Sequence, residues 1–256
     1  MNLTACTFAV LLGTAAVADM AYSADIRVAP GPGALVRAVE LAQPGDRLVL
    51  GDGPYQGGFI LTKPLVLQGS GVTHVIGTGT GSVITIDAAD VIIEGLKLTG
   101  SGRSHKTIDS GVQMTKKATG AIVRNNRIED NLYGVDIHGA RDALVAGNTI
   151  IGSDERLMSR RGNGVYVWNA PGATVSGNTI RLGRDGIFVN TSRKNTLTNN
   201  RFEKLRFAIH YMNADDSEVS GNISIGNHLG YAIMFSKRVT IRDNISLDDR
   251  DHGIML

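Results

Sequence analysis

The sequence predicts an all-β fold, a right-handed parallel β-helix with coils of about 22 residues. Three observations predict it: regularly spaced asparagines, a second series of small residues that each open an apolar strand, and many short alternating strands followed by turns. A coil of this length cannot bury its own apolar face, whereas stacked coils bury a continuous column of Val, Ile and Leu.

The asparagine series gives the period of the repeat. Its members are separated by 22, 30, 22, 22 and 22 residues and are Asn126, Asn148, Asn178, Asn200, Asn222 and Asn244. We expect each to lie in a turn, where asparagine tolerates the left-handed conformation, and we expect the stacked amides to hydrogen-bond along the axis. The longer step reflects a polar insertion at residues 153–161, which projects from one coil.

The N-terminal segment reads as a secretory signal peptide over residues 1–23. The run 3–18 is apolar and lacks charged side chains, and it leads to an A-x-S cleavage pattern that ends at Ser23. The single cysteine, Cys6, lies inside this run, so the mature chain has no thiolate for metal binding or catalysis. We therefore expect export to the periplasm.

Residues 24–256 form one predicted domain. A short helix at residues 34–42 caps its N-terminal end, and apolar strands follow at 48–50, 65–67, 83–86, 91–93, 122–123, 144–145, 174–175, 197, 219 and 239–241. The last four residues lie in the middle of a predicted strand with unprotected apolar side chains. We therefore expect the domain to be truncated at its C-terminus, because solenoids need a polar cap.

The second series predicts which side chains face outward. It consists of Gly134, Gly164, Gly186, Ala208, Ala232 and Gly253. The first and third residues after each should point inward, which includes the pairs Ile233/Phe235 and Ile254/Leu256. The alternation then sends outward one column of Asp136, Tyr166, Phe188, His210, Met234 and Met255, and a second of His138, Trp168, Asn190, Met212 and Ser236.

The outward columns suggest a metal site. His210, Met234 and Met255 should be stacked neighbours about 4.8 Å apart, with Met212 two residues along from His210. Thioether and imidazole together suit Cu(I). His228 and His252, just ahead of the last two strands, are further candidate ligands. The alternative is that the methionines are ordinary packing and that these two histidines are solvated or capping residues.

The aromatic part of the same face suggests a partner surface. Tyr166, Trp168 and Phe188 would form an exposed apolar strip, which usually marks a binding surface. The alternative is that the insertion at residues 153–161 covers them.

The sequence disfavours a nucleic-acid-binding protein and a carbohydrate-active enzyme. A formal net charge of +2 without basic runs is atypical of a nucleic-acid-binding surface. Many parallel β-helices are polysaccharide lyases, hydrolases or epimerases, whose sites need clustered carboxylates. Asp136 is the only carboxylate in the outward columns, so we expect a protein that is not an enzyme, with a carbohydrate-active β-helix enzyme as the alternative.

Several segments resemble the NosD family of periplasmic maturation proteins for nitrous-oxide reductase. They are RGNGVYVWNAPG at 161–172, GRDGIFVN at 183–190, LRFAIHYM at 205–212, GNHLGYAIMF at 226–235, DRDHG at 249–253, and the start of the domain at 44–46 and 53–57. The resemblance spans the mature chain, although NosD relatives continue for many more coils.

The resemblance implies an accessory role in assembly of the copper-sulfur centre of the reductase, NosZ. It implies that the protein works with an ATP-driven ABC transporter of NosF and NosY type and with a copper donor of NosL type. It also implies that the protein contacts the membrane only through the transporter. A transient Cu(I) site on the His/Met face fits this role, and a metal-free docking scaffold remains the alternative.

Overall fold

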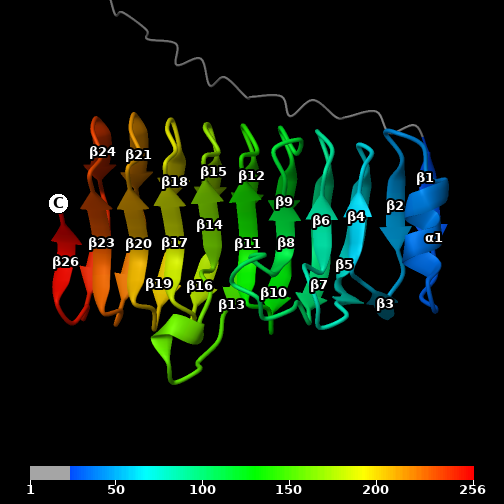
Figure 1. The fold of residues 1–256 in the computed structure, drawn as a ribbon, viewed down its shortest axis with the longest axis horizontal. Coiled ribbons are helices and arrows are strands. Elements are labelled where there is room, and N and C mark those ends of the chain that lie inside the picture. Colours follow the sequence, from blue (N-terminus) through cyan, green and yellow to red (C-terminus); the bar gives the residue numbers. More distant parts are fainter. Residues whose placement is uncertain (1–23) are drawn as a thin grey trace, which may run out of the picture.

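The computed structural model describes residues 24–256 as one stack of coils, with the strands of successive coils side by side along the long axis (Figure 1). Every strand pair is parallel, which confirms the predicted parallel β-helix. The predicted signal peptide at 1–23 lies outside the described residues. No helix within 24–256 is long and apolar enough to cross a membrane.

Each complete coil contributes three strands, which form three long rows. One row is a nine-stranded sheet that contains every candidate metal ligand except His228. In the order of the chain, its strands are β4 (Phe59–Leu61), β6 (Ile84–Ile86), β8 (Ser110–Met114), β11 (Tyr133–His138), β14 (Val165–Trp168), β17 (Asp185–Asn190), β20 (Phe207–Met212), β23 (Leu229–Met234) and β26 (His252–Met255).

The other two rows form one bent 17-stranded sheet, because β5 (Val66–Ile76) and β7 (Ile92–Thr99) run through both rows. The first of these rows also contains β1 (Asp25–Val28), β2 (Arg47–Leu50), β9 (Ile122–Arg124), β12 (Leu144–Ala146), β15 (Thr174–Ser176), β18 (Thr196–Thr198), β21 (Ser217–Ser220) and β24 (Val239–Arg242). The second also contains β3 (Pro54–Gln56), β10 (Arg127–Glu129), β13 (Thr149–Ile151), β16 (Thr179–Arg181), β19 (Arg201–Glu203), β22 (Ile223–Ile225) and β25 (Ile245–Leu247).

The predicted capping helix is confirmed as α1 (Ala34–Leu41), at the end of the stack beside β1 (Figure 1). Its buried Leu35 and Val39 join the core, which continues as columns of Val, Ile and Leu through the coils. Three tyrosines lie in this core. The hydroxyl of Tyr231 donates to the carbonyl oxygens of Asn222 and Ile245, both at 2.9 Å, so its polar atom is satisfied.

The predicted asparagine stack is confirmed as a buried ladder. The side-chain oxygen of Asn178 accepts from both the backbone N–H and the side-chain amide of Asn148, at 2.9 and 3.0 Å, and the same pattern recurs from Asn126 to Asn244. The left-handed residue is the one before each ladder asparagine, such as Gly147 or Asn199. The sequence-based placement of that conformation on the ladder residue itself was therefore wrong.

The register of β23 also differs from the prediction. Tyr231 aligns with Ile209 and Ile233 with Tyr211, so Gly230 and not Ala232 is the small residue that opens this strand. A Cβ at Gly230 would lie 2.2 Å from the carbonyl oxygen of Gly253, which explains why this position is glycine. The predicted inward pair Ile233/Phe235 is corrected to Tyr231/Ile233, and Phe235 is 79% exposed.

Three further features concern the C-terminal end of the stack and two loops. Leu256 is largely exposed and Ile254 is half exposed, as expected from the sequence for unprotected apolar side chains at this end, because no coil within residues 24–256 covers β26. Residues 153–161 project from one edge of the stack, as predicted, and contain a short 3-10 helix, η1 (Met158–Arg160) (Figure 1). A second loop, 101–109, leads into β8.

Candidate metal centre and its flanking clefts

The corrected register rearranges the outward columns of the nine-stranded sheet. His210 aligns with Ala232, and Ala232 aligns with Met255, whereas Met234 aligns with Met212 in the second column. Met234 is therefore not the stacked neighbour of His210, and Met255 is two coils from His210. The physical reason is that β23 opens at Gly230, which shifts each of its side chains by two positions relative to the prediction.

The new arrangement still gathers four of the predicted ligands around one small residue. His210 and Met255 flank Ala232 along the axis, and Met212 and Met234 lie side by side in the neighbouring column. All four are partly exposed, while Ala232 is fully buried. Because the small Ala232 lies between His210 and Met255 in the register, we call these four side chains the Ala232 cluster.

His210 is held in position by a buried ion pair. Its Nδ1 lies 3.2 Å from Oδ2 of Asp185, and Arg206 donates to both oxygens of Asp185 at 2.7 and 2.6 Å. Burial acts to raise the Asp185 pKa, but hydrogen bonds from His210 and Arg206 outweigh it and hold the pKa below its ordinary value. Because Nδ1 is engaged, Nε2 is the nitrogen left for a metal.

The other two predicted ligands lie apart from the Ala232 cluster. His228 sits in the turn before β23, where its Nε2 lies 3.0 Å from Oδ2 of Asp251. His252 opens β26, aligned with Leu229, and is exposed. Within residues 24–256 no group of three or more His, Cys, Asp or Glu side chains could hold a metal ion. A metal at this face would therefore depend on thioether ligands.

The aromatic residues form a ladder that ends at His210. The ring centroids of Tyr166 and Phe188 are 5.3 Å apart, and those of Phe188 and His210 are 4.4 Å apart, with nearly parallel planes in both pairs. Trp168 lies one column away and stacks on His138 at 4.3 Å. The predicted strip is thus divided between two columns, and its role as a partner surface stays a prediction.

Asp136 is fully buried, although sequence reasoning placed it on the outward face. Its Oδ2 accepts a 3.2 Å hydrogen bond from Gln113, and its Oδ1 has no partner. Burial raises the pKa of Asp136 to about 7. Gln113 also donates to the carbonyl oxygen of Thr107, which ties the 101–109 loop to this face. Sequence reasoning did not find this burial, because it depends on the packing of neighbouring coils, such as the one that contains Gln113.

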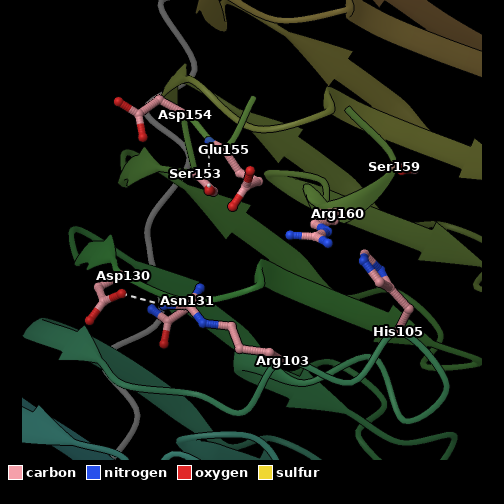
Figure 2. Close-up of a pocket in the computed structure, with 10 residues that line it drawn as sticks. Arg103, His105, Asp130, Asn131, Ser153, Asp154, Glu155, Ser159 and Arg160 are labelled. Carbon is pink, nitrogen blue, oxygen red and sulfur yellow. Dashed lines mark hydrogen bonds and ion pairs between the residues drawn. The ribbon is translucent and has the colours of Figure 1, made fainter. Parts of the chain in front are cut away.

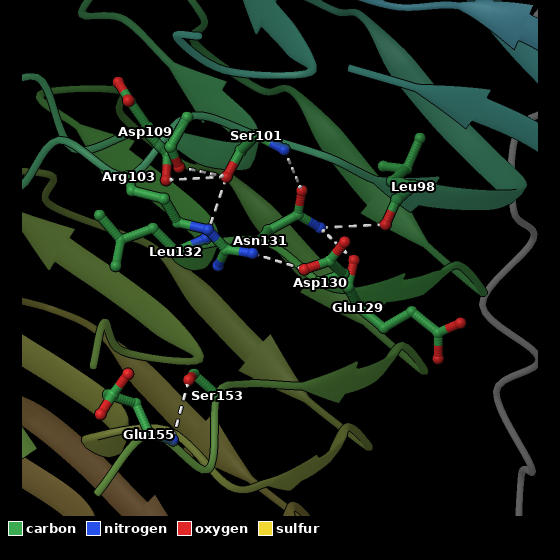
Figure 3. Close-up of polar contacts among 11 residues, drawn as sticks. Leu98, Ser101, Arg103, Asp109, Glu129, Asp130, Asn131, Leu132, Ser153 and Glu155 are labelled. Carbon is green, nitrogen blue, oxygen red and sulfur yellow. Dashed lines mark hydrogen bonds and ion pairs between the residues drawn. The ribbon is translucent and has the colours of Figure 1, made fainter. Parts of the chain in front are cut away.

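The 101–109 loop is fixed by buried polar groups (Figure 3). Ser101 donates its backbone N–H to Asn131, and its hydroxyl accepts from the backbone N–H of Leu132 at 2.9 Å. The Asp109 carboxylate accepts from Ser104 and Thr107 within the loop. These bonds place His105 over the aromatic ladder, with its Nδ1 3.0 Å from the hydroxyl of Tyr133.

Three clefts line this edge of the stack. The first, of about 680 Å³, lies between the 101–109 loop and the insertion, with Arg103, His105 and Arg160 facing Asp154 and Glu155 (Figure 2). The second, of about 370 Å³, lies over the aromatic ladder and contains His210 and Met212. The third, of about 480 Å³, lies between Met158 and Arg250. Two of the candidate ligands, His210 and Met212, therefore open into a cleft.

The chain is similar to proteins of one described family. A family model described as NosD, periplasmic copper-binding protein, matches residues 148–256. A probable ABC transporter binding protein NosD of Stutzerimonas stutzeri is 35% identical over 204 residues, which cover 80% of this chain and 47% of that protein. A protein of the same description from Pseudomonas aeruginosa is 36% identical over 73 residues, which cover 28% of this chain and 67% of that protein.

Among solved structures, an alginate lyase from Paenibacillus sp. str. FPU-7 aligns with a TM-score of 0.57 at 18% identity, covering 86% of this chain and 97% of that one. This likeness supports the fold alone. The chain spans about half the length of the Stutzerimonas relative. The identity to these NosD proteins and the match to the family model establish that the chain belongs to the NosD family.

Proposed function

We propose that this protein is a periplasmic accessory factor for assembly of the copper-sulfur centre of nitrous-oxide reductase, acting with an ABC transporter. The family's description as periplasmic and copper-binding supports the location and the cargo. The relatives' description as ABC transporter binding proteins supports the transporter as a partner and a role that is not enzymatic. The reductase NosZ and a copper donor of NosL type complete the proposal.

The observation that carries the copper part is the pairing of Met212 with Met234 next to His210. The two methionines are on adjacent strands, so their sulfur atoms can approach one ion. Soft thioether ligands select Cu(I) over the hard divalent cations, and imidazole also suits copper. Met255 lies on the far side of Ala232 and can supply a further thioether.

The surrounding residues fit a site that accepts and releases its cargo. Asp185 fixes the imidazole of His210 through Nδ1, as carboxylates commonly do for histidine ligands, and it orients Nε2. The methionine side chains are flexible and partly exposed, so a second protein can reach the ion and exchange ligands with it. An exposed thioether site of this kind suits transfer of copper better than permanent retention.

The experiment is an anaerobic Cu(I) titration against a calibrated chromophoric chelator. The test variant is Met212→Leu/Met234→Leu, which removes both sulfur atoms but keeps the volume and apolar character. We expect its Cu(I) affinity to fall by more than about tenfold, since even loss of supporting residues around a metal commonly costs that much. Met158→Leu, in the insertion, is the matched control and should bind Cu(I) as the unaltered protein does.

Three other results would each contradict part of the proposal. If the unaltered protein binds no Cu(I), the copper part of the proposal is wrong and a metal-free docking scaffold is favoured. If both leucine variants bind equally well, copper binds elsewhere, and a His252→Ala variant tests the exposed histidine of β26. If the protein instead depolymerises a uronate polymer, with activity lost in Asp136→Asn, the carbohydrate-active alternative replaces the proposal.

A further inference from the structure

Two of the clefts adjoin at one residue and form a longer groove. Arg206 lines both the cleft over the aromatic ladder and the cleft below Met158. We call the combined depression the basic groove. It crosses successive coils, because the N–H of Arg206 donates to the carbonyl oxygen of Arg184 one coil earlier. From the coil of Arg161 to that of Arg250 it spans roughly 19 Å, which is about six residues of extended chain.

The charge of the basic groove is one-sided. Its lining residues include Arg161, Arg184, Lys204, Arg206 and Arg250, but only one carboxylate, Asp185. Asp185 is fully buried and is already neutralised by Arg206. Across residues 24–256 no carboxylate forms an ion pair with the other four cations. The groove therefore presents uncompensated positive charge to any ligand.

One of these cations is positioned by the insertion. The guanidinium of Arg161 donates to the backbone carbonyl oxygens of Asp154, Glu155 and Gly183. Backbone carbonyl oxygens orient the side chain without cancelling its charge. The insertion thus fixes one wall of the groove, and its Met158 adds an apolar contact at the rim.

The aromatic floor of the groove favours an acidic peptide over an acidic polysaccharide as its ligand. Tyr166, Phe188 and His210 stack on one another with planes only 17° apart, so their faces contact each other and their edges line the groove. Pyranose rings need an exposed aromatic face, whereas ring edges carry partial positive charge and attract carboxylate oxygens. The apolar, partly exposed Ile108 and Met212 suit aliphatic side chains.

We propose that the basic groove binds an extended acidic segment of a partner protein, with its carboxylates on Arg184, Lys204 and Arg250. This docking function does not depend on the copper proposal, because none of these three residues is a proposed copper ligand. The contacts are solvent-exposed ion pairs, so binding should be fast and should weaken as salt increases.

The test measures fluorescence anisotropy of a labelled ten-residue peptide of alternating Glu and Leu. The groove variant is Arg184→Gln/Lys204→Gln/Arg250→Gln. The control variant, Arg141→Gln/Arg193→Gln/Lys194→Gln, removes three cations that form no ion pair within residues 24–256 and lie away from the basic groove. Circular dichroism of both variants should be measured to check that they keep their fold.

We expect the groove variant to lose roughly 3- to 100-fold in affinity, as three exposed ion pairs imply, and the control variant to bind normally. A peptide of alternating Lys and Leu should not bind. The proposal is overturned if the acidic peptide shows no saturable binding, or if both variants lose affinity equally. It is also overturned if hexagalacturonate binds more tightly than the peptide with the same dependence on the groove. Retention of Cu(I) binding by the groove variant separates this result from the copper proposal.

Discussion

At the residue scale, two buried aspartates of the same sheet have opposite electrostatic environments. Asp185 has a guanidinium and an imidazole beside it, and its pKa is lowered although it is fully buried. Asp136 has one amide donor and an unpartnered Oδ1, so burial dominates and its pKa rises to about 7. The number of cationic partners, and not the depth of burial, therefore separates a permanent carboxylate from one that is protonated below neutral pH.

The raised pKa predicts that Asp136 makes the fold less stable as pH increases. The unfolded chain releases this proton near the ordinary aspartate value of 3.8, whereas the folded protein keeps it up to about 7. Between those two values each pH unit costs about 1.4 kcal/mol, which amounts to at most about 4 kcal/mol above neutral pH. Asp136→Asn stays neutral, so it should be increasingly more stable than the unaltered protein up to pH 7, with a constant difference above it.

Urea unfolding at a series of pH values measures this difference. Asp154→Asn is the control, because Asp154 is an exposed carboxylate in the insertion. A pH profile of Asp136→Asn parallel to that of the unaltered protein would show that Asp136 ionises normally in the folded state.

At the scale of the strand, one register decides the chemistry of the candidate metal centre. At Gly230 a Cβ would meet the backbone of Gly253, so only glycine fits there. This requirement sets the register of β23, in which Met234 lies beside Met212. A shift of two residues would place Met234 beside His210 instead. The signal was present in the sequence, since Gly230 follows Ala208 by 22 residues, the period of the repeat.

The asparagine ladder predicts a large cost for loss of a single amide. In Asn178→Ala the backbone N–H and the side-chain amide of Asn148 lose their acceptor, and the carbonyl oxygen of Val145 loses a donor. Each buried group left unsatisfied costs about 1–3 kcal/mol, so we expect a loss of at least about 2 kcal/mol in the free energy of unfolding. Asn190→Ala, on the partly exposed outer face, should cost less than about 1 kcal/mol.

Chemical denaturation of the two variants distinguishes the ladder from a general effect of losing an amide. Equal losses in both would mean that the ladder amides contribute no more than solvated ones.

At the scale of the whole molecule, stability is the sum of contacts between neighbouring coils. An inner coil is covered on both sides, whereas β25 and β26 have a neighbour on one side only in the described chain. Their apolar side chains reflect this, because Ile245, Leu247 and Ile254 are all about half exposed. Cooperative opening is therefore expected to begin at this end of the stack.

Hydrogen exchange of this chain checks that expectation. Amides of β25 and β26 should exchange fastest among the strands, and amides of β14 and β17 slowest, with protection increasing coil by coil between them. Uniform protection across all strands would show that the stack opens as one unit.

The sequence by itself determined the repeat, because burial of one apolar column demands the same spacing in every coil. The capping helix, the asparagine ladder and the projecting insertion followed from that spacing, and so did the presence of His210 and Met212 on the outer face. Only the tertiary structure decided the register of β23, the burial of Asp136 beside Gln113, and the junction of two clefts at Arg206. These features arise where one coil or loop lies against another, and a repeat period specifies which residues face outward without specifying what covers them.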